Sequence, residues 1–209
     1  MEKLHYIPDW VKNGIIYHIY PYGFFNTPKL NEMDSEINNR LEKIRDYYSH
    51  FQKLGVNIIQ FSPIFESISH GYDTTDYMRI DRRLGTNEMF KEIVDELHSL
   101  NIKVIVDGVF NHVGREFESF KDVQENRENS QKKQWHFINF SGNSPNNDGF
   151  DYKNWEGHYG LVKLNLSNLD VKNFIYSVCK YWLGEIGIDG WRLDVAYQIS
   201  KDFWREFRQ

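Results

Sequence analysis

The sequence predicts an α/β fold in which parallel strands alternate with helices. Short β-branched runs alternate four times with segments of helical apolar spacing, the pattern of strands joined by right-handed crossovers. Strand candidates such as NIIQF and KVIVDGV are almost continuously apolar, as in strands covered on both faces. No G-x-G-x-x-G or P-loop follows any of them, which weakens the case for a nucleotide-binding sheet. Two architectures are compatible with this pattern: an open doubly wound sheet and part of a (β/α)8 barrel.

The first two strands and the helix between them are expected in the N-terminal quarter. Residues 15–20 read IIYHIY and stop at a proline, which predicts a buried strand. Residues 36–54 carry apolar side chains at helical spacing, and Gly55 is placed to end that helix. The second strand is expected at 57–61. The polar, Gly-containing stretch 62–77 is expected to be an irregular loop.

The next strand is framed by a helix before it and a long excursion after it. Apolar residues at 89–100 predict an amphipathic helix, with Thr86 or Asn87 as its N-cap. Residues 103–109 form the third expected strand. The excursion over 111–168 is rich in Asn, Gly and aromatic residues and shows no clear helical period, which predicts an irregular lobe.

The last part of the chain repeats the helix–strand pattern. Asp170 can cap a third helix that runs to Leu183, the fourth strand is expected in IDGWRLDVA at 188–196, and a fourth helix begins near Ser200. The expected organisation is therefore the first three βα units at 1–110, an inserted lobe at 111–168, and the third helix, fourth strand and start of the fourth helix at 169–209.

Composition narrows the class of protein. The net charge of −5 with interspersed signs argues against nucleic acid as a partner, since that needs a clustered basic face. The aromatic content of 16% suits sugar-binding clefts as well as ordinary cores. The single cysteine, Cys179, lies among apolar residues and is interpreted as packing. No apolar signal segment and no run of about 18 apolar residues is visible, so we expect a soluble cytoplasmic protein without a membrane partner.

The fourth strand carries the strongest candidate for chemistry. Alternation along a strand puts Arg192 and Asp194 on one face, with Trp191 and Leu193 on the other. An adjacent guanidinium favours an ionised carboxylate and orients it, as a carboxylate nucleophile requires. The alternative is a buried structural ion pair, which is the more common meaning of an isolated R-x-D.

Polar residues also follow the second and third strands, where a parallel α/β protein places its site. Tyr72 and Asp73 belong to a G-Y-D that also fits an ordinary turn. Asp107, Asn111 and His112 form D-x-x-x-N-H at the end of the third strand. A lone loop histidine is more often solvated or packed than catalytic. Zinc is disfavoured because no H-x-x-x-H or Cys/His cluster is present.

Taken together, these motifs resemble a known family. GYD at 71–73, DGVFNH at 107–112 and GWRLD at 190–194, in this order, are similar to the N-terminal half of the catalytic barrel of the α-amylase superfamily of retaining glycoside hydrolases. The lobe is most similar to the cyclomaltodextrinase and neopullulanase branch. That branch commonly has MPKLN where this chain has LVKLN at 161–165. The resemblance implies four βα units of a (β/α)8 barrel, with the lobe inserted after the third strand.

The resemblance also implies roles for individual residues. It makes Asp194 the nucleophile that attacks the anomeric carbon and Arg192 the residue that orients it. The reacting sugar is expected to contact four further side chains: Tyr72 as a stacking platform, Asp73 as a polar partner, His112 as a hydroxyl donor, and Asp107. No cofactor is expected to be required. Asn111 matches a calcium ligand of many amylases, so calcium is an optional ligand.

The resemblance further implies what must act together with these residues. Retaining glycosidases need a second carboxyl group as general acid and base, which the family supplies as a Glu after its fifth strand. The sequence stops after the fourth, so this chain alone is expected to be inactive and to pair with a C-terminal half or self-associate through open sheet edges. The expected function is an α-glucan-acting retaining hydrolase or transglycosylase. The alternative is a non-catalytic α-glucan-binding or self-assembling module.

Overall fold

The centre of the molecule is a four-stranded parallel sheet. The computed structural model describes residues 7–32 and 34–208. The strands run in the spatial order β1 (Ile16–Ile19), β2 (Ile58–Phe61), β5 (Lys103–Gly108) and β11 (Gly190–Leu193), and every neighbouring pair is parallel. This order equals the order along the chain, as expected for successive βα units with crossovers of one hand.

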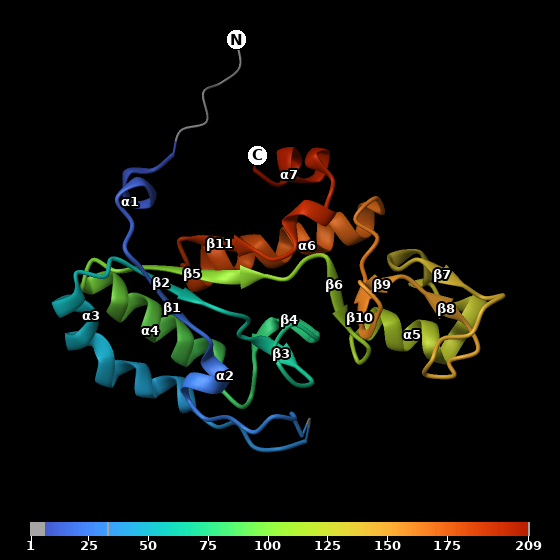
Figure 1. Ribbon diagram of the computed structural model, residues 1–209, viewed down its shortest axis with the longest axis horizontal. Helices are drawn as coiled ribbons and strands as arrows, with labels where there is room; N and C mark the ends of the chain where they lie inside the picture. The colour runs from blue at the N-terminus through green and yellow to red at the C-terminus, as the bar shows by residue number, and fades with distance from the viewer. Residues whose placement is uncertain (1–6, 33, 209) are drawn as a thin grey trace, which may run out of the picture.

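Helices connect these strands. The bounds are α1 (Asp9–Lys12) and α2 (Pro21–Phe24) near the N-terminus, the 3-10 helix η1 (Arg40–Tyr47) continuing into α3 (Tyr48–Leu54), then α4 (Asn87–Ser99), α6 (Leu169–Tyr181), the π-helical η4 (Trp182–Ile186), the 3-10 turn η5 (Ala196–Gln198) and α7 (Lys201–Phe207). In Figure 1, α3 and α4 lie along one side of β1, β2 and β5. The strands provide the fully buried side chains of this core: Ile59, Phe61, Val104 and Val106.

The four predicted strands and the helices between them are present, but the first strand differs in its burial. The strand β1 is an edge strand, because its only sheet partner among the described residues is β2. Ile15 and Ile16 are therefore about half exposed, at 54% and 52%, and the prediction of a buried strand is wrong for this end. Thr86 caps α4 as predicted, since its hydroxyl accepts from Met89 N. The third helix is capped by Asn168 and not by Asp170.

The segment after β1 begins its helix later than predicted. Backbone amides in the segment 38–41 form hydrogen bonds to carbonyls of the loop 82–84. Asn38 N donates to Arg82 O, and Leu41 N donates to Leu84 O. These bonds replace the first helical turn, so regular structure begins at Arg40 as a 3-10 helix.

The stretch 62–77 is not an irregular loop, which corrects the prediction. It contains β3 (Phe65–Ser67) and the start of β4 (Thr74–Ile80), paired antiparallel. Its buried Glu66 forms an ion pair with Arg82, and directly after β4 Asp81 pairs with Arg83 at 2.7 Å between Oδ2 and Nη2. A strand whose charged side chains are satisfied inside the protein has no alternating apolar pattern, and this is why the sequence concealed it.

The lobe is more regular than predicted. Its elements are β6 (His112–Gly114), α5 (Glu118–Asn126), η2 (Arg127–Asn129), η3 (Lys133–Trp135), β7 (Ile138–Asn139), β8 (Asp151–Tyr152), β9 (Asn154–Trp155) and β10 (His158–Lys163). The helix α5 was not expected, because only two large apolar side chains, Phe120 and Val123, mark its buried face. Figure 1 shows the lobe extending from the end of β5 away from the helices α3 and α4.

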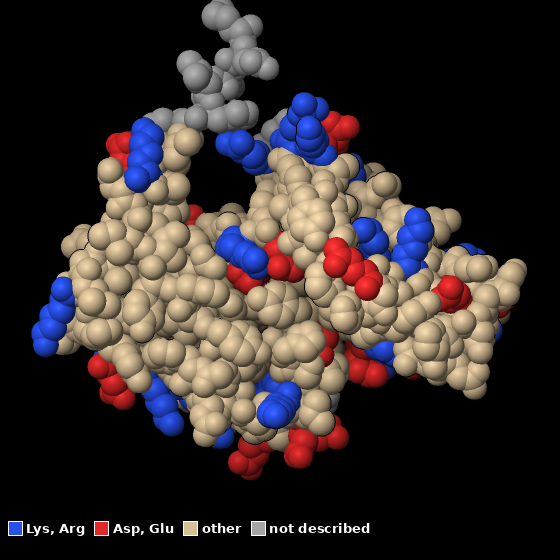
Figure 2. All heavy atoms as spheres, viewed as in Figure 1, with Lys and Arg blue, Asp and Glu red and all other residues tan. Residues whose placement is uncertain are grey.

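The surface shows mixed charge. On the face seen in Figure 2, basic side chains are scattered among acidic ones. Within the described residues, none of the helices is both long and apolar enough to cross a lipid bilayer.

Candidate active site at the carboxyl ends of the strands

Sheet register brings three predicted site residues together. Asp107 and Arg192 are Cα partners in the parallel pair β5–β11, so their side chains project from the same face. Arg192 Nη1 donates to Asp107 Oδ2 at 3.0 Å and to Asp194 Oδ1 at 2.8 Å. The predicted pairing of Arg192 with Asp194 is confirmed, and one guanidinium holds two carboxylates from neighbouring segments.

The two carboxylates have different surroundings. The side chain of Asp107 is 1% exposed, and burial raises its pKa to about 7 against the opposing influence of Arg192. Tyr72 OH approaches Asp107 Oδ2 at 3.5 Å, and Asp107 Oδ1 is buried with no hydrogen-bond partner. Asp194 instead lines a cavity. Asp194 can contact a ligand in the cavity directly. Asp107 does not line the cavity and contacts Arg192, which in turn holds Asp194.

His112 is held in one orientation beside this cavity. Its ring is 1% exposed, and Asn111 Nδ2 donates to Nδ1 at 3.2 Å. Burial lowers the pKa of His112 to about 4, so the ring is neutral at pH 7. With Asn111 Nδ2 as the donor to Nδ1, the proton is assigned to Nε2, which is buried without a side-chain partner, while the Tyr72 backbone nearby slightly opposes the lowering of the pKa. His112 therefore presents one N–H donor that a ligand hydroxyl can satisfy.

The cavity at this position has a volume of about 390 Å³. Eight residues line it: His70, Tyr72, His112, Trp155, His158, Leu161, Asp194 and Val195. Its size and mixture of aromatic and polar walls fit a small polar ligand with apolar faces, such as a sugar ring. Among the lining residues, Asp194 is the one carboxylate.

The lobe contributes a wall that sequence reasoning missed. Trp155 and His158 stack with ring centroids 5.1 Å apart and planes at 21°. They flank the two-residue turn between β9 and β10, where Glu156 and Gly157 both have positive φ. Such a turn is typical of a tight hairpin, so the Glu-Gly pair between a Trp and a His was the available signal.

The same turn is tied to the segment after the candidate nucleophile. Glu156 Oε1 accepts hydrogen bonds from Tyr197 OH at 3.1 Å and Gln198 Nε2 at 3.0 Å. Between these residues and Asp194 lies Val195, whose φ of 50° is rare for a β-branched residue. A backbone held there costs on the order of 1–3 kcal/mol, and such strain concentrates at functional sites.

Besides Asp107 and Arg192, two further predicted site residues, Asp73 and Asn111, lie outside the cavity lining. Asp73 accepts hydrogen bonds from Ser69 N and Ser69 Oγ, at 3.2 and 2.6 Å, within the turn that precedes β4. Asn111 lies behind His112 and is 1% exposed. Asn111 contacts the lining residue His112 through its amide, and Asp73 Oδ1 lies 3.6 Å from Nδ1 of the lining residue His70.

Calcium fits this site poorly. Ca²⁺ takes six to eight oxygen ligands, several of them usually carboxylates. Asn111 Oδ1 is buried without a partner, but no group of three or more His, Cys, Asp or Glu side chains in the described chain is arranged to hold a metal ion. Ca²⁺ can also take amide and backbone oxygens, which such a group does not include, so optional calcium binding at Asn111 stays a prediction.

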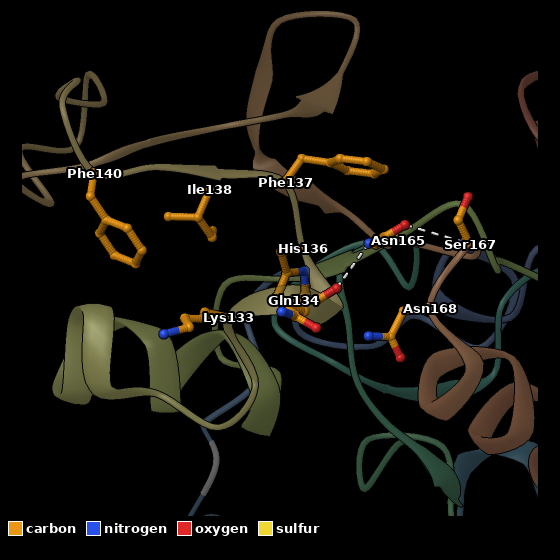
Figure 3. A pocket seen from close by; sticks show the side chains of 9 residues that line it. All are labelled: Lys133, Gln134, His136, Phe137, Ile138, Phe140, Asn165, Ser167 and Asn168. Atoms are coloured by element: carbon orange, nitrogen blue, oxygen red, sulfur yellow. Dashed lines mark hydrogen bonds between the residues drawn. The ribbon is translucent and has the colours of Figure 1, made fainter.

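A second cavity, of about 530 Å³, lies between the lobe and the start of α6. Figure 3 shows Phe137, Ile138 and Phe140 along one side of it, while Asn165 bonds to the Gln134 carbonyl and the Ser167 amide. No carboxylate is among its lining residues, so it lacks the group that the cavity at Asp194 has for chemistry.

Comparison with known proteins agrees with this geometry. Residues 18–206 match the family model described as the α-amylase catalytic domain. The chain is 38% identical over 97% of its length to a cyclomaltodextrinase of Bacillus sp. and 36% identical over 97% to an intracellular maltogenic amylase of Bacillus subtilis, covering 39% and 36% of those proteins. A cyclic α-maltosyl-(1→6)-maltose hydrolase of Arthrobacter globiformis superposes with a TM-score of 0.83 at 35% identity, over 96% of this chain and 48% of that one.

The chain thus spans between 36% and 48% of the length of these relatives, and it corresponds to the N-terminal half of their (β/α)8 barrel. The predicted resemblance to the branch that contains the cyclomaltodextrinases is confirmed. By sequence and structure, the chain belongs to the α-amylase catalytic-domain family of glycoside hydrolases.

Proposed function

We propose that this chain provides the nucleophile half of a retaining glycoside hydrolase that acts on α-glucosidic bonds of starch-type oligosaccharides. The observation that carries the proposal is the cavity in which Asp194, oriented by Arg192, faces the aromatic side chains of Tyr72 and Trp155. Asp194 Oδ1 accepts from Arg192, which leaves Oδ2 to attack the anomeric carbon of a sugar. The relatives named cyclomaltodextrinase and maltogenic amylase support this substrate class.

His112 and Tyr72 would bind the reacting sugar. The Nε2–H of His112 is a fixed donor for a hydroxyl, and a sugar hydroxyl would satisfy its unmet hydrogen bond. The ring of Tyr72 supplies an apolar face for the sugar, and its hydroxyl points toward Asp107. Asp107, buried beneath Arg192, sets the position of the guanidinium.

Turnover on natural glucans would need a second carboxyl group. Asp107 cannot serve as the general acid, because it is 1% exposed and does not line the cavity. We therefore place the acid/base group in the half of the barrel that relatives have beyond the matched region, and this chain alone would be inactive on unactivated substrates. Losing that group typically removes about 10²- to 10⁴-fold in rate.

A substrate with an activated leaving group tests the nucleophile independently of the acid/base group. With 5-fluoro-α-glucosyl fluoride, Asp194 forms the C1–O bond while the C1–F bond breaks and fluoride leaves with its electron pair, a step that needs no acid. Intact-mass measurement should show a covalent adduct on the unaltered chain and on Asp202→Asn, an exposed carboxylate control. Asp194→Asn should show none. No adduct on the unaltered chain, although it binds maltotriose by calorimetry, contradicts a live nucleophile.

A second candidate, a binding or self-assembling half-barrel, is favoured by the sheet edges. In the described sheet, β1 and β11 each have one neighbour, and Ile15 and Ile16 are half exposed beside the free edge of β1. Open edges of this kind pair with other chains. Light scattering after size exclusion tests it: dimers or larger species that persist at micromolar concentration support pairing through the edges, and a monomer at high concentration contradicts it.

We also propose that the protein acts in the cytoplasm. Support comes from the relative from Bacillus subtilis, which is named as intracellular. Fractionation of the source cells, with the chain detected by antibody, tests this location.

A further inference from the structure

The backbone directly after Asp194 makes a strained turn. Before the turn, Asp194 N donates to Gly108 O at 3.1 Å, which continues the pairing of β11 with β5. The chain then turns at Val195, with φ of 50° and ψ of 30°, into η5. A β-branched residue rarely adopts this left-handed conformation, so contacts made by the following residues must keep the turn in place.

Glu156 of the lobe supplies such contacts. Its Oε1 atom accepts hydrogen bonds from Tyr197 OH at 3.1 Å and from Gln198 Nε2 at 3.0 Å. Hydrogen bonds to an ionised carboxylate are stronger than those between neutral groups. Tyr197 is 77% exposed, so packing does little to fix its side chain. Trp204 Nε1 also donates to Ala196 O at 3.0 Å, which anchors the backbone of η5 but not these two side chains. The lobe therefore holds η5 through one carboxylate oxygen.

The turn that carries Glu156 is closely tied to the cavity. Glu156 and Gly157 have φ of 48° and 90° and form the tight connection between β9 and β10. The stacked rings of Trp155 and His158 flank this turn in the sequence, and both line the cavity that contains Asp194. Glu156 does not line that cavity. It is therefore placed to act on Asp194 through the residues it holds, and not by contact with a ligand.

We propose that Glu156 is a positioning residue for the candidate nucleophile. Its two hydrogen bonds to η5 hold the turn at Val195, and that turn directs Oδ2 of Asp194 toward the anomeric carbon. The inference rests on the proposed function, because it concerns the reaction in which Asp194 attacks a sugar. It makes the rate of that attack depend on the lobe as well as on Arg192.

Labelling of the full chain by 5-fluoro-α-glucosyl fluoride, in which the C1–O bond to Asp194 forms as fluoride leaves with the C1–F electron pair, tests this. Intact mass is followed over time at several reagent concentrations. Glu156→Ala should lower the maximal labelling rate by about 10- to 100-fold, the effect of a misplaced reacting group, and change the half-saturating concentration by less than about twofold. Glu156→Gln should stay within about threefold of the unaltered rate, because its amide oxygen accepts the same hydrogen bonds. Glu125→Ala, at an exposed glutamate of α5 in the lobe, is the matched control and should leave both constants unchanged.

A second variant tests the same link from its other end. Tyr197→Phe combined with Gln198→Ala removes both donors and leaves Glu156 in place. It should slow labelling as much as Glu156→Ala does. Adding Glu156→Ala to it should cause no further loss, because the changes break one shared interaction. If circular dichroism shows that Glu156→Ala is unfolded, the rate of the Tyr197→Phe, Gln198→Ala variant decides.

The outcomes separate this inference from the proposed function. Labelling of Glu156→Ala at the unaltered rate, or a loss confined to the half-saturating concentration, overturns the positioning role and leaves the proposed function standing. If the unaltered chain is not labelled, the proposed function fails, and NMR decides whether Glu156 holds the turn. The three-bond coupling between the amide and α protons of Val195, which reports φ, should then change in Glu156→Ala and not in Glu156→Gln. An unchanged coupling overturns the inference.

Discussion

Arg192 Nη1 lies 3.0 Å from Asp107 Oδ2 and 2.8 Å from Asp194 Oδ1, so a single nitrogen joins a buried carboxylate to one that faces a cavity. The parallel register of β5 and β11 brings Asp107 and Arg192 side by side on one face of the sheet, because they are paired residues of adjacent strands. Changes at Arg192 should therefore alter both stability and the orientation of Asp194.

Replacing Arg192 by Met should destabilise the protein by about 1–3 kcal/mol at pH 8, because Asp107 then lies buried without its cation. The loss should be smaller at pH 5.5, where Asp107 can take up a proton. Urea unfolding at pH 8 and at pH 5.5 measures the difference in the free energy of unfolding between the variant and the unaltered protein. Arg205→Met removes an exposed ion pair with Asp202 and should change stability by less than about 0.5 kcal/mol. Equal losses at the two pH values would contradict the role assigned to Asp107.

Asp107→Asn should alter the pH dependence of unfolding. The pKa of Asp107 is raised to about 7 in the folded protein, so the folded state binds its proton more tightly than the unfolded state. The contribution of Asp107 to stability is present below about pH 4 and is lost as pH rises to about 7. The variant should therefore gain stability relative to the unaltered protein over this range, by no more than about 4 kcal/mol.

The pKa shift of His112 has the opposite sign to that of Asp107. Its contribution to stability cancels when the unaltered protein is compared with Asp107→Asn. Its pKa is lowered to about 4, so its contribution is present above about pH 6.5 and lost as pH falls through 4. Both proteins contain His112, and the difference between their unfolding free energies isolates Asp107. A difference that stays constant from pH 4 to pH 7 excludes a raised pKa at Asp107.

His112 should be observable as a single neutral tautomer. Long-range ¹⁵N NMR should show its proton on Nε2, with no titration between pH 8 and pH 5.5, because burial opposes the charged ring. Asn111→Ala removes the donor to Nδ1 and should produce a mixture of tautomers. Protonation of His112 above pH 6 in the unaltered protein would show that the site is more hydrated than its burial indicates.

Gly114→Ala should loosen the junction between the lobe and the barrel strands. A Cβ atom at Gly114 would lie 2.4 Å from the backbone oxygen of Asp73, which cannot move aside as a side chain can. We expect a loss of about 1–3 kcal/mol, measured by thermal unfolding. Gly160→Ala, in the neighbouring strand β10 with no atom within 4 Å, is the control and should be nearly neutral. Equal effects would contradict the close contact.

Local patterns in the sequence were sufficient for the parallel strands, for most helices and for the family. β-branched runs and 3.6-residue spacing report which faces are buried, and burial of those faces is what creates the sheet. The motifs around Asp107, His112 and Asp194 were visible for the same reason, since each lies within or just after a predicted strand. The pairing of Arg192 with Asp194 follows from alternation within one strand, so it needed no knowledge of the fold.

Tertiary structure decided what no local pattern contains. The strand pair at Phe65–Ser67 and Thr74–Ile80 was concealed because long-range ion pairs satisfy its charges. Trp155 and His158 line one cavity with Asp194 only because the lobe folds back over the strand ends, and Tyr22 of α2 can approach Gly71 closely only because that residue has no Cβ. The second link from Arg192, to Asp107, depends on the register of β5 with β11, a relationship between residues 85 positions apart. Sequence periodicity records burial along one segment, whereas contacts between segments arise from packing.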